Sequence, residues 1–243
     1  MRAAWGVAGI VLLCAQPARG TECTTSIVGG APTLQRLDAE VRLRFIRERL
    51  QAEARRARTW SYAWGATYAA LMIGQLVPLP FVSPETRLDL YVGTAGAALG
   101  LIPVVVMPLR VMRDDRWLAR RLDRAPAGTH PCVLLAEAES LLVRDAANEA
   151  WGRSWLFHTG NVVVNAGIFF IIGAGFGHWV SAVVSGLSGV AVGELMIFTQ
   201  PTGAVRDLRR YRDGDLGSPA ERRLTLAPLV GRRIVGALVV AVF

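Results

Sequence analysis

The chain has few of the side chains on which many enzymes and metal proteins depend. Its 243 residues include only three histidines and three cysteines, and these never come together in the spacing of a metal-binding cluster. The sequence also has no Walker-type phosphate loop and no G-x-G-x-x-G turn between a strand and a helix. We therefore expect no catalytic constellation, no bound metal and no cofactor.

Lysine is missing altogether, so all 27 basic residues are arginine, and the formal net charge is +8. A basic protein can bind nucleic acid. Here the arginines lie mostly beside apolar spans and interleave with Asp and Glu, which favours a membrane-flanking role. We therefore expect no nucleic acid partner. The arginines are instead expected to flank a membrane and to meet anionic lipid or another envelope protein.

Long apolar segments are what the sequence has in excess. Hydrophobic residues make up 52% of the chain and its mean hydropathy is +0.36, as in proteins with several segments buried in lipid. Four segments are long and apolar enough to cross a bilayer as helices: residues 60–82, 90–109, 155–177 and 179–200. The lipid bilayer is therefore the first predicted partner.

Part of the sequence occurs twice. The pattern G-x2-G-x3-G inside an apolar run, followed by proline and by R-D-x-R, returns after 93 residues. Small residues at this spacing let the backbones of neighbouring helices approach each other closely. We interpret these glycines as helix-packing positions. They are Gly93, Gly96 and Gly100 in the first copy and Gly186, Gly189 and Gly193 in the second.

The predicted fold is an all-α integral membrane protein with four transmembrane helices. They form two helical hairpins in parallel tandem repeat, each preceded by an amphipathic helix, and the chain can form a homo-oligomer. The first amphipathic helix is expected to lie against the membrane or a partner helix. In the second, Glu137 and Glu139 are expected to be solvated. The predicted parts are a signal peptide (1–20), an extramembrane helix (21–59), a first hairpin (60–109), a polar linker (110–154), a second hairpin (155–200) and a basic tail (201–243) that ends in a short β-hairpin.

Two signals disagree about orientation. Residues 1–20 resemble a secretory signal peptide, and cleavage before Thr21 places the basic segments outside the cytoplasm. The arginines on those segments favour the cytoplasmic side. Cleavage also removes Cys14 and leaves Cys23 and Cys132, an even pair that is a candidate disulfide. We favour a bacterial inner membrane location with the basic segments in the periplasm, and keep the cytoplasmic orientation as the alternative.

A group of polar residues lies within the predicted spans. His158, Asn161 and Asn165 share one helix face, and Glu194 lies at the depth of Asn161 on the next span. An ionisable residue in lipid is costly and marks a candidate functional site. The alternative interpretation is a set of interhelical hydrogen bonds that locks the bundle. Gln75 on the first span is a further candidate member.

The sequence indicates the function less directly than the fold. Gly186-Leu187-Ser188-Gly189 resembles the G-x-S-G motif of rhomboid proteases, but no histidine follows Ser188 to act as its base. We therefore reject that resemblance. A non-enzymatic scaffold that docks a partner through its basic segments fits the sequence best. The alternative is a small transporter or channel around Glu194. A lipid-modifying enzyme is a third class, for which we find no set of catalytic residues.

Overall fold

The computed structural model describes residues 21–217, 223–231 and 234–242, and it gives the backbone alone for the last two ranges. Apart from one C-terminal hairpin of strands and an isolated bridge between Glu22 and Asp38, the described chain is helical. The helices are α1 (Pro32–Gln35), α2 (Ala39–Leu76), η1 (Leu79–Phe81), α3 (Pro84–Val106), α4 (Val111–Asp123), α5 (Pro131–Gly152), α6 (Trp155–Phe170), the π-helical turn η2 (Ile171–Gly175), α7 (Trp179–Thr199) and α8 (Gly203–Arg212).

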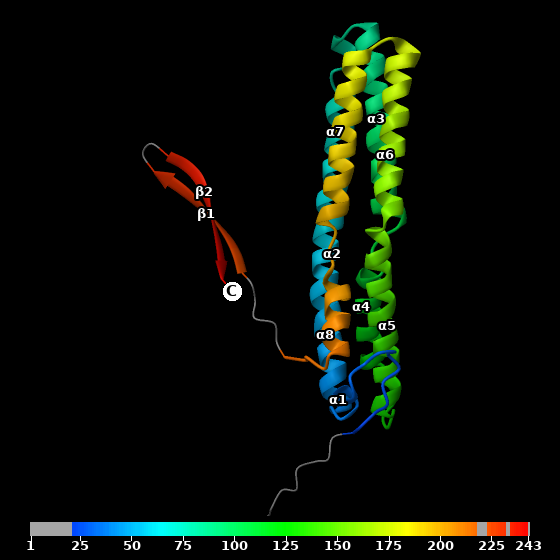
Figure 1. Ribbon diagram of the computed structural model, residues 1–243, viewed down its shortest axis with the longest axis vertical. Coiled ribbons are helices and arrows are strands. Elements are labelled where there is room, and N and C mark those ends of the chain that lie inside the picture. Colours follow the sequence, from blue (N-terminus) through cyan, green and yellow to red (C-terminus); the bar gives the residue numbers. More distant parts are fainter. Residues whose placement is uncertain (1–20, 218–222, 232–233, 243) are drawn as a thin grey trace, which may run out of the picture.

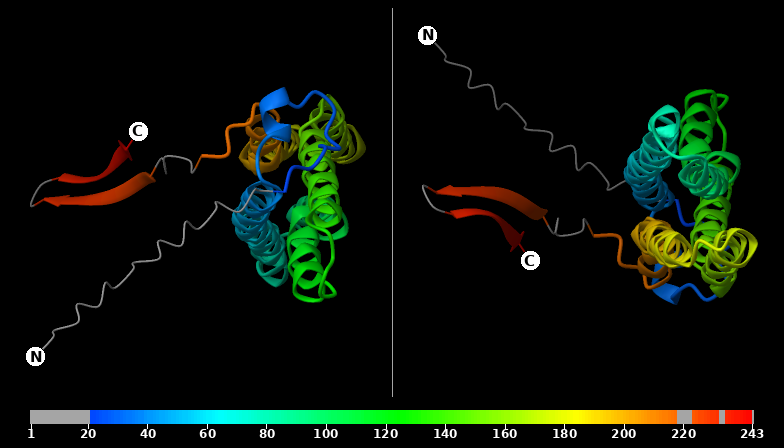
Figure 2. Two further views of the ribbon diagram at one scale, coloured as in Figure 1. Left: turned by 90° about the horizontal axis from the view of Figure 1, so that it is seen from below. Right: turned by 90° about the horizontal axis from the view of Figure 1, so that it is seen from above.

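The helices pack side by side into one long bundle, in which the chain runs up and down in successive columns (Figure 1). Helix α2 makes the first column, α3 and α4 the second, α5 and α6 the third, and α7 and α8 the fourth. Within the apolar half, α2 packs along α3 and α6 packs along α7. Figure 2 shows the α2–α3 hairpin beside the α6–α7 hairpin when the bundle is seen along its axis.

Three helical stretches are long and apolar enough to cross a membrane. They are Pro84–Asp123, Pro131–Gly175 and Trp179–Arg212. Their apolar halves leave large hydrophobic side chains exposed, as Val180 and Leu187 are at 81% and 69%, which suits contact with lipid. The second half of α2 carries no charged residue after Arg58, but its tryptophans, tyrosines and Gln75 make it less apolar. The predicted first span is therefore not among the three.

The other half of the bundle is a polar body with its own core, which we call the cap and define as residues 21–59, 110–154 and 201–217. Helix α1, the first half of α2, and helices α4, α5 and α8 build it. Its buried apolar residues include Leu34, Ile46, Leu50, Leu118, Leu135, Leu142 and Tyr211. Burial of these side chains supplies the main favourable free energy of the cap.

In two segments of the cap the structure is more definite than the sequence-based expectation. Of the two alternatives expected for the amphipathic segment before the first predicted span, the structure shows contact with partner helices. This part of α2 packs against α4, α5 and α8, and the helix continues unbroken to Leu76. No secondary structure was predicted for the first part of the basic tail. It forms α8, which buries Leu208 and Tyr211 in the cap core.

The tip of the first hairpin is also tighter than expected. Residues 83–89 separate the first two predicted spans, but α3 already begins at Pro84. The side chain of Ser83 accepts a hydrogen bond from the backbone N–H of Thr86, and proline occupies the first helical position. Both features are typical of a helix start.

The elements recur at the predicted offset. Shifted by 93 residues, the starts of α2, α3 and α4 fall on 132, 177 and 204, within two residues of the starts of α5, α7 and α8. The second copy differs because its long column is interrupted at Arg153–Ser154, between α5 and α6. The duplication itself stays a prediction.

The C-terminal strands are β1 (Arg223–Gly231) and β2 (Ile234–Val242). They pair antiparallel with each other, from Arg223 opposite Val242 to Gly231 opposite Ile234. The predicted hairpin thus has its counterpart in the described backbone. Residues 1–20, where the signal peptide is predicted, lie outside the described residues.

Candidate functional sites in the apolar helices and in the cap

The predicted polar cluster comes together between α6 and α7. Glu194 has both carboxylate oxygens engaged: Oε2 lies 2.6 Å from Nδ1 of His158, and Oε1 accepts a hydrogen bond of 3.0 Å from Asn161. The amide of Asn161 also donates to the carbonyl of Val190 at 3.0 Å. Asn165 donates to both the backbone and side-chain oxygens of Asn161 at 2.8 Å.

The His158–Glu194 pair of this cluster lies at the margin of the bundle. The side chains of His158 and Glu194 are 32% and 24% exposed, and neither lines the cavity between the hairpins. A carboxylate bonded to an imidazole can exchange a proton with it. The described geometry therefore permits proton exchange between His158 and Glu194 at the edge of the bundle. It equally permits a purely structural role, in which these hydrogen bonds hold α6 against α7. Gln75 does not join the cluster, because its amide donates to the carbonyl of Leu71.

A cavity of about 750 Å³ lies between the two hairpins. Its lining is mostly apolar, with Tyr68 contributed by α2, and Asn161 and Asn165 by α6. The volume falls within the range of roughly 300–1,000 Å³ typical of small-molecule sites.

All six predicted packing glycines face a neighbouring side chain or backbone. A Cβ at Gly100 would overlap the ring of Tyr68, and a Cβ at Gly193 would overlap the amide of Asn161. Tyr68 and Asn161 are 93 positions apart, as are the two glycines, so both hairpins use the same contact. The other close approaches are Gly93 to Gln75, Gly96 to Ile168, Gly186 to Phe169 and Gly189 to Asn165.

A second histidine pair lies at the far end of the apolar half. Nδ1 of His178, just before α7, is 2.7 Å from Oδ1 of Asp89 in α3. The contact joins the tips of the two hairpins. Sequence reasoning missed it, because Asp89 and His178 lie in the short turns at the ends of the predicted spans and belong to no motif.

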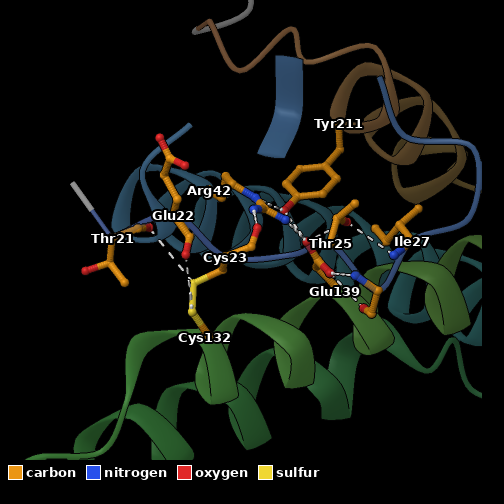
Figure 3. Close-up of polar contacts among 10 residues, drawn as sticks. Thr21, Glu22, Cys23, Thr25, Ile27, Arg42, Cys132, Glu139 and Tyr211 are labelled. Carbon is orange, nitrogen blue, oxygen red and sulfur yellow. Dashed lines mark hydrogen bonds and ion pairs between the residues drawn. A yellow bond between two sulfur atoms is a disulfide. The ribbon is translucent and has the colours of Figure 1, made fainter. Parts of the chain in front are cut away.

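The centre of the cap holds a buried ion pair between Arg42 of α2 and Glu139 of α5 (Figure 3). Both side chains are fully buried. The Arg42 guanidinium bonds Glu139, donates to the hydroxyl oxygen of Tyr211 at 2.9 Å and donates to the carbonyl of Cys23 at 2.7 Å. Glu139 was expected to be solvated, and that expectation is wrong.

The carboxylate of Glu139 accepts hydrogen bonds from three parts of the chain. Tyr211 donates to it at 2.6 Å, the backbone and hydroxyl of Ser26 each donate at 2.7 Å, and Thr25 donates at 3.0 Å. Burial opposes ionisation of Glu139, but the hydrogen bonds from Tyr211, Ser26 and Arg42 hold its pKa below the ordinary value. Glu139 is therefore a carboxylate that ties the N-terminal segment and α8 to α5.

A disulfide joins Cys23 to Cys132 beside this network (Figure 3). The two Cα atoms are 5.4 Å apart, and 109 residues separate the cysteines in the chain. Because the carbonyl of Cys23 accepts from Arg42, the covalent link and the ion pair fix the same stretch of backbone. These are the two cysteines that remain if the predicted signal peptide is removed.

Two carboxyl groups of α5 are buried with little compensation. Asp145 is 1% exposed, and burial beside Asp114 raises its pKa well above the ordinary value. Glu149 is also 1% exposed, and burial near Glu53 raises its pKa to about 8. Neither carboxyl oxygen of Asp145 has a hydrogen-bond partner among the described residues, so burial favours the protonated, neutral form of this side chain. Asp114 itself pairs with Arg144 at 2.8 Å. Among the described residues no group of three or more His, Cys, Asp or Glu is arranged to hold a metal ion.

Comparisons with protein-family models, with curated proteins and with solved structures find no match to this chain. Function therefore has to be argued from the described geometry alone.

Proposed function

We propose that all four predicted segments cross the membrane, with the second half of α2 as the fourth span. Three apolar helices already meet the requirement for a span. Helix α2 runs along α3 over the same length of the bundle (Figure 1) and lacks charged residues beyond Arg58. Four spans also leave the cap segments on one side of the bilayer, as their joint packing requires. The matching contacts of Gly100 and Gly193 support two duplicated hairpins.

We further propose that the cap lies outside the cytoplasm, in the periplasm of a bacterial cell. The Cys23–Cys132 disulfide supports this orientation, because such bonds persist in oxidising compartments and are rare in the cytosol. The predicted signal peptide is consistent with the same side.

The proposed activity is that of a non-enzymatic scaffold that docks an acidic partner on the cap. The observation that supports it is the uneven distribution of charge between the interior and the surface of the cap. Five acidic residues are buried, namely Glu53, Glu139, Asp145, Glu149 and Asp207, whereas Arg42 is the one buried arginine among the residues whose burial the structure describes. The remaining cap arginines cover its surface. That surface is therefore more positive than the formal net charge indicates, and it suits a partner of opposite charge.

Site-specific photo-cross-linking in intact cells tests this function. A photoreactive residue at Val41, Trp117 or Val133 samples the faces of α2, α4 and α5, since these side chains are 41–50% exposed. We expect a discrete protein adduct from at least one of these positions and none from Val180 at the distant tip of α7. Adduct formation through α2 should also fall in Arg44→Gln/Arg47→Gln and persist in Arg120→Gln/Arg124→Gln. No adduct from any cap position would exclude docking.

A small transporter is the second candidate, because His158 and Asn161 both contact the carboxylate of Glu194. Its test is Glu194→Gln, which keeps the shape of the side chain and removes the proton site. A proton-coupled transporter would lose activity, whereas the scaffold would retain its cap adducts. Unchanged flux of every ion and solute assayed would exclude this candidate.

A further inference from the structure

A second recess, of about 640 Å³, lies where the cap meets the apolar helices. Its walls come from the middle of α2, the link between α5 and α6, and the segment from the end of α7 into α8. Four arginines line it: Arg55 and Arg56 from α2, Arg153 from the link and Arg206 from α8. Arginines that are distant in sequence therefore surround one space.

The recess carries excess positive charge. Its only acidic residue is Glu53, which is buried and already accepts from the backbone N–H of Gly203 at 3.2 Å and pairs with Arg56 at 3.3 Å. Arg55 and Arg206 are exposed, and no described carboxylate forms an ion pair with either of them. The recess is therefore suited to an anion with several acceptor oxygens.

The position of the recess along the bundle indicates that the anion is a lipid headgroup. Trp60 lines it, and the indole N–H groups of Trp60 and Trp64 donate to the hydroxyl of Thr199 at 3.3 and 3.0 Å. Tryptophan rings gather at the headgroup level of membranes. Beyond Trp60 the helix is uncharged, and Phe198 beside the recess is 61% exposed to the region where lipid chains would lie.

We propose that this recess binds the phosphate of an anionic phospholipid such as phosphatidylglycerol. The guanidinium groups of Arg55, Arg153 and Arg206 receive the phosphate oxygens, and the acyl chains run along the outside of α2 and α7. The site rests on the proposed membrane placement of α2. It is separate from the cap faces sampled by Val41, Trp117 and Val133, so docking and lipid binding can fail independently.

Native mass spectrometry of the purified full chain tests the proposal, with phosphatidylglycerol or phosphatidylcholine added to the detergent. We expect one tightly held phosphatidylglycerol per chain and no comparable phosphatidylcholine. The variant Arg55→Gln/Arg206→Gln should bind phosphatidylglycerol about 30-fold more weakly, from roughly 1 kcal/mol per arginine near a membrane surface. The control Arg36→Gln/Arg124→Gln removes the same charge from exposed positions outside the recess and should bind like the wild type.

Two further measurements distinguish bidentate arginine contacts from charge alone, and a lipid headgroup from free phosphate. Arg55→Lys/Arg206→Lys keeps the charge but loses bidentate contacts, and its intermediate affinity would show that the recess survives in a folded variant. Inorganic phosphate at the concentration of the lipid should give no thermal stabilisation. The proposal is overturned if phosphate stabilises the protein as much as the lipid does, if phosphatidylcholine binds equally well, or if recess and control variants weaken alike.

Discussion

Replacing Arg42 by methionine tests whether the buried ion network holds the cap together. Methionine has a similar length and helix propensity, so α2 itself should persist. The substitution removes three hydrogen-bonded contacts and leaves the Glu139 carboxylate buried without its cation. Breaking such a pair costs about 3–5 kcal/mol. Because Tyr211, Ser26 and Thr25 still donate to Glu139, we expect a value near the lower end.

The assay is thermal unfolding in detergent, followed by circular dichroism at one fixed scan rate, since unfolding of such a protein need not be reversible. A loss of about 3 kcal/mol corresponds to a fall in Tm of roughly 6–12 °C for a chain of this size. The control is Arg47→Met, which removes an exposed arginine from the same helix and should leave Tm nearly unchanged. The double variant Arg42→Met/Glu139→Leu removes both charges and should recover part of the loss.

The pH dependence provides an independent check of the same prediction. Without Arg42, burial should raise the pKa of Glu139, so protonation at mildly acidic pH relieves the unpaired charge. The Tm difference between Arg42→Met and the wild type should therefore shrink as pH falls from 7 towards 5. A variant with wild-type Tm, or a double variant that loses the full sum of both single losses, would refute the role given to the network.

Three other substitutions have expected outcomes. The raised pKa of Asp145 makes its contribution to stability complete below the ordinary aspartate pKa and lost as pH rises towards the folded pKa. The free energy of unfolding should therefore fall above about pH 4, by up to about 1.4 kcal/mol per pH unit, and Tm should fall with it. Asp145→Asn should flatten this slope in part, because Glu149 contributes a slope of the same sign. Gly193→Ala pushes a methyl group into Asn161, whereas Gly167→Ala meets open space, so Tm should fall in the first variant alone, measured in the same detergent. Cys132→Ser opens a loop of 109 residues and should cost about 2–4 kcal/mol, and chemical reduction of the wild type should lower Tm by a similar amount.

Several features can be predicted from the sequence because they depend on local pattern and helix geometry. Residues 155–200 are predicted as an antiparallel helical pair because only a short Gly-rich turn divides two apolar runs. The meeting of Asn161 with Glu194 follows from their equal distances from the span ends, at about 1.5 Å per residue.

The cap centre is harder to predict because its partners are remote in the chain. Arg42 and Glu139 are 97 positions apart. They are buried by apolar residues of α2, α5 and α8, which come together only when these helices pack. One signal is local: Arg42 lies three residues after Ala39 and four before Ile46, within an apolar helical stripe. A charge in such a stripe needs an opposite charge on a facing helix. Helix α8 is missed for a related reason, since its many arginines conceal the buried positions Leu208 and Tyr211.

The intact mass of the purified chain, alkylated with and without prior reduction, tests the central claim most directly. That claim is that the cap lies outside the cytoplasm and is cross-linked by the Cys23–Cys132 disulfide. We predict a chain that begins at Thr21, with both remaining cysteines protected from alkylation until a reductant is added. A full-length chain with three thiols that react without reduction would contradict the claim, and would favour a cap that faces the cytoplasm.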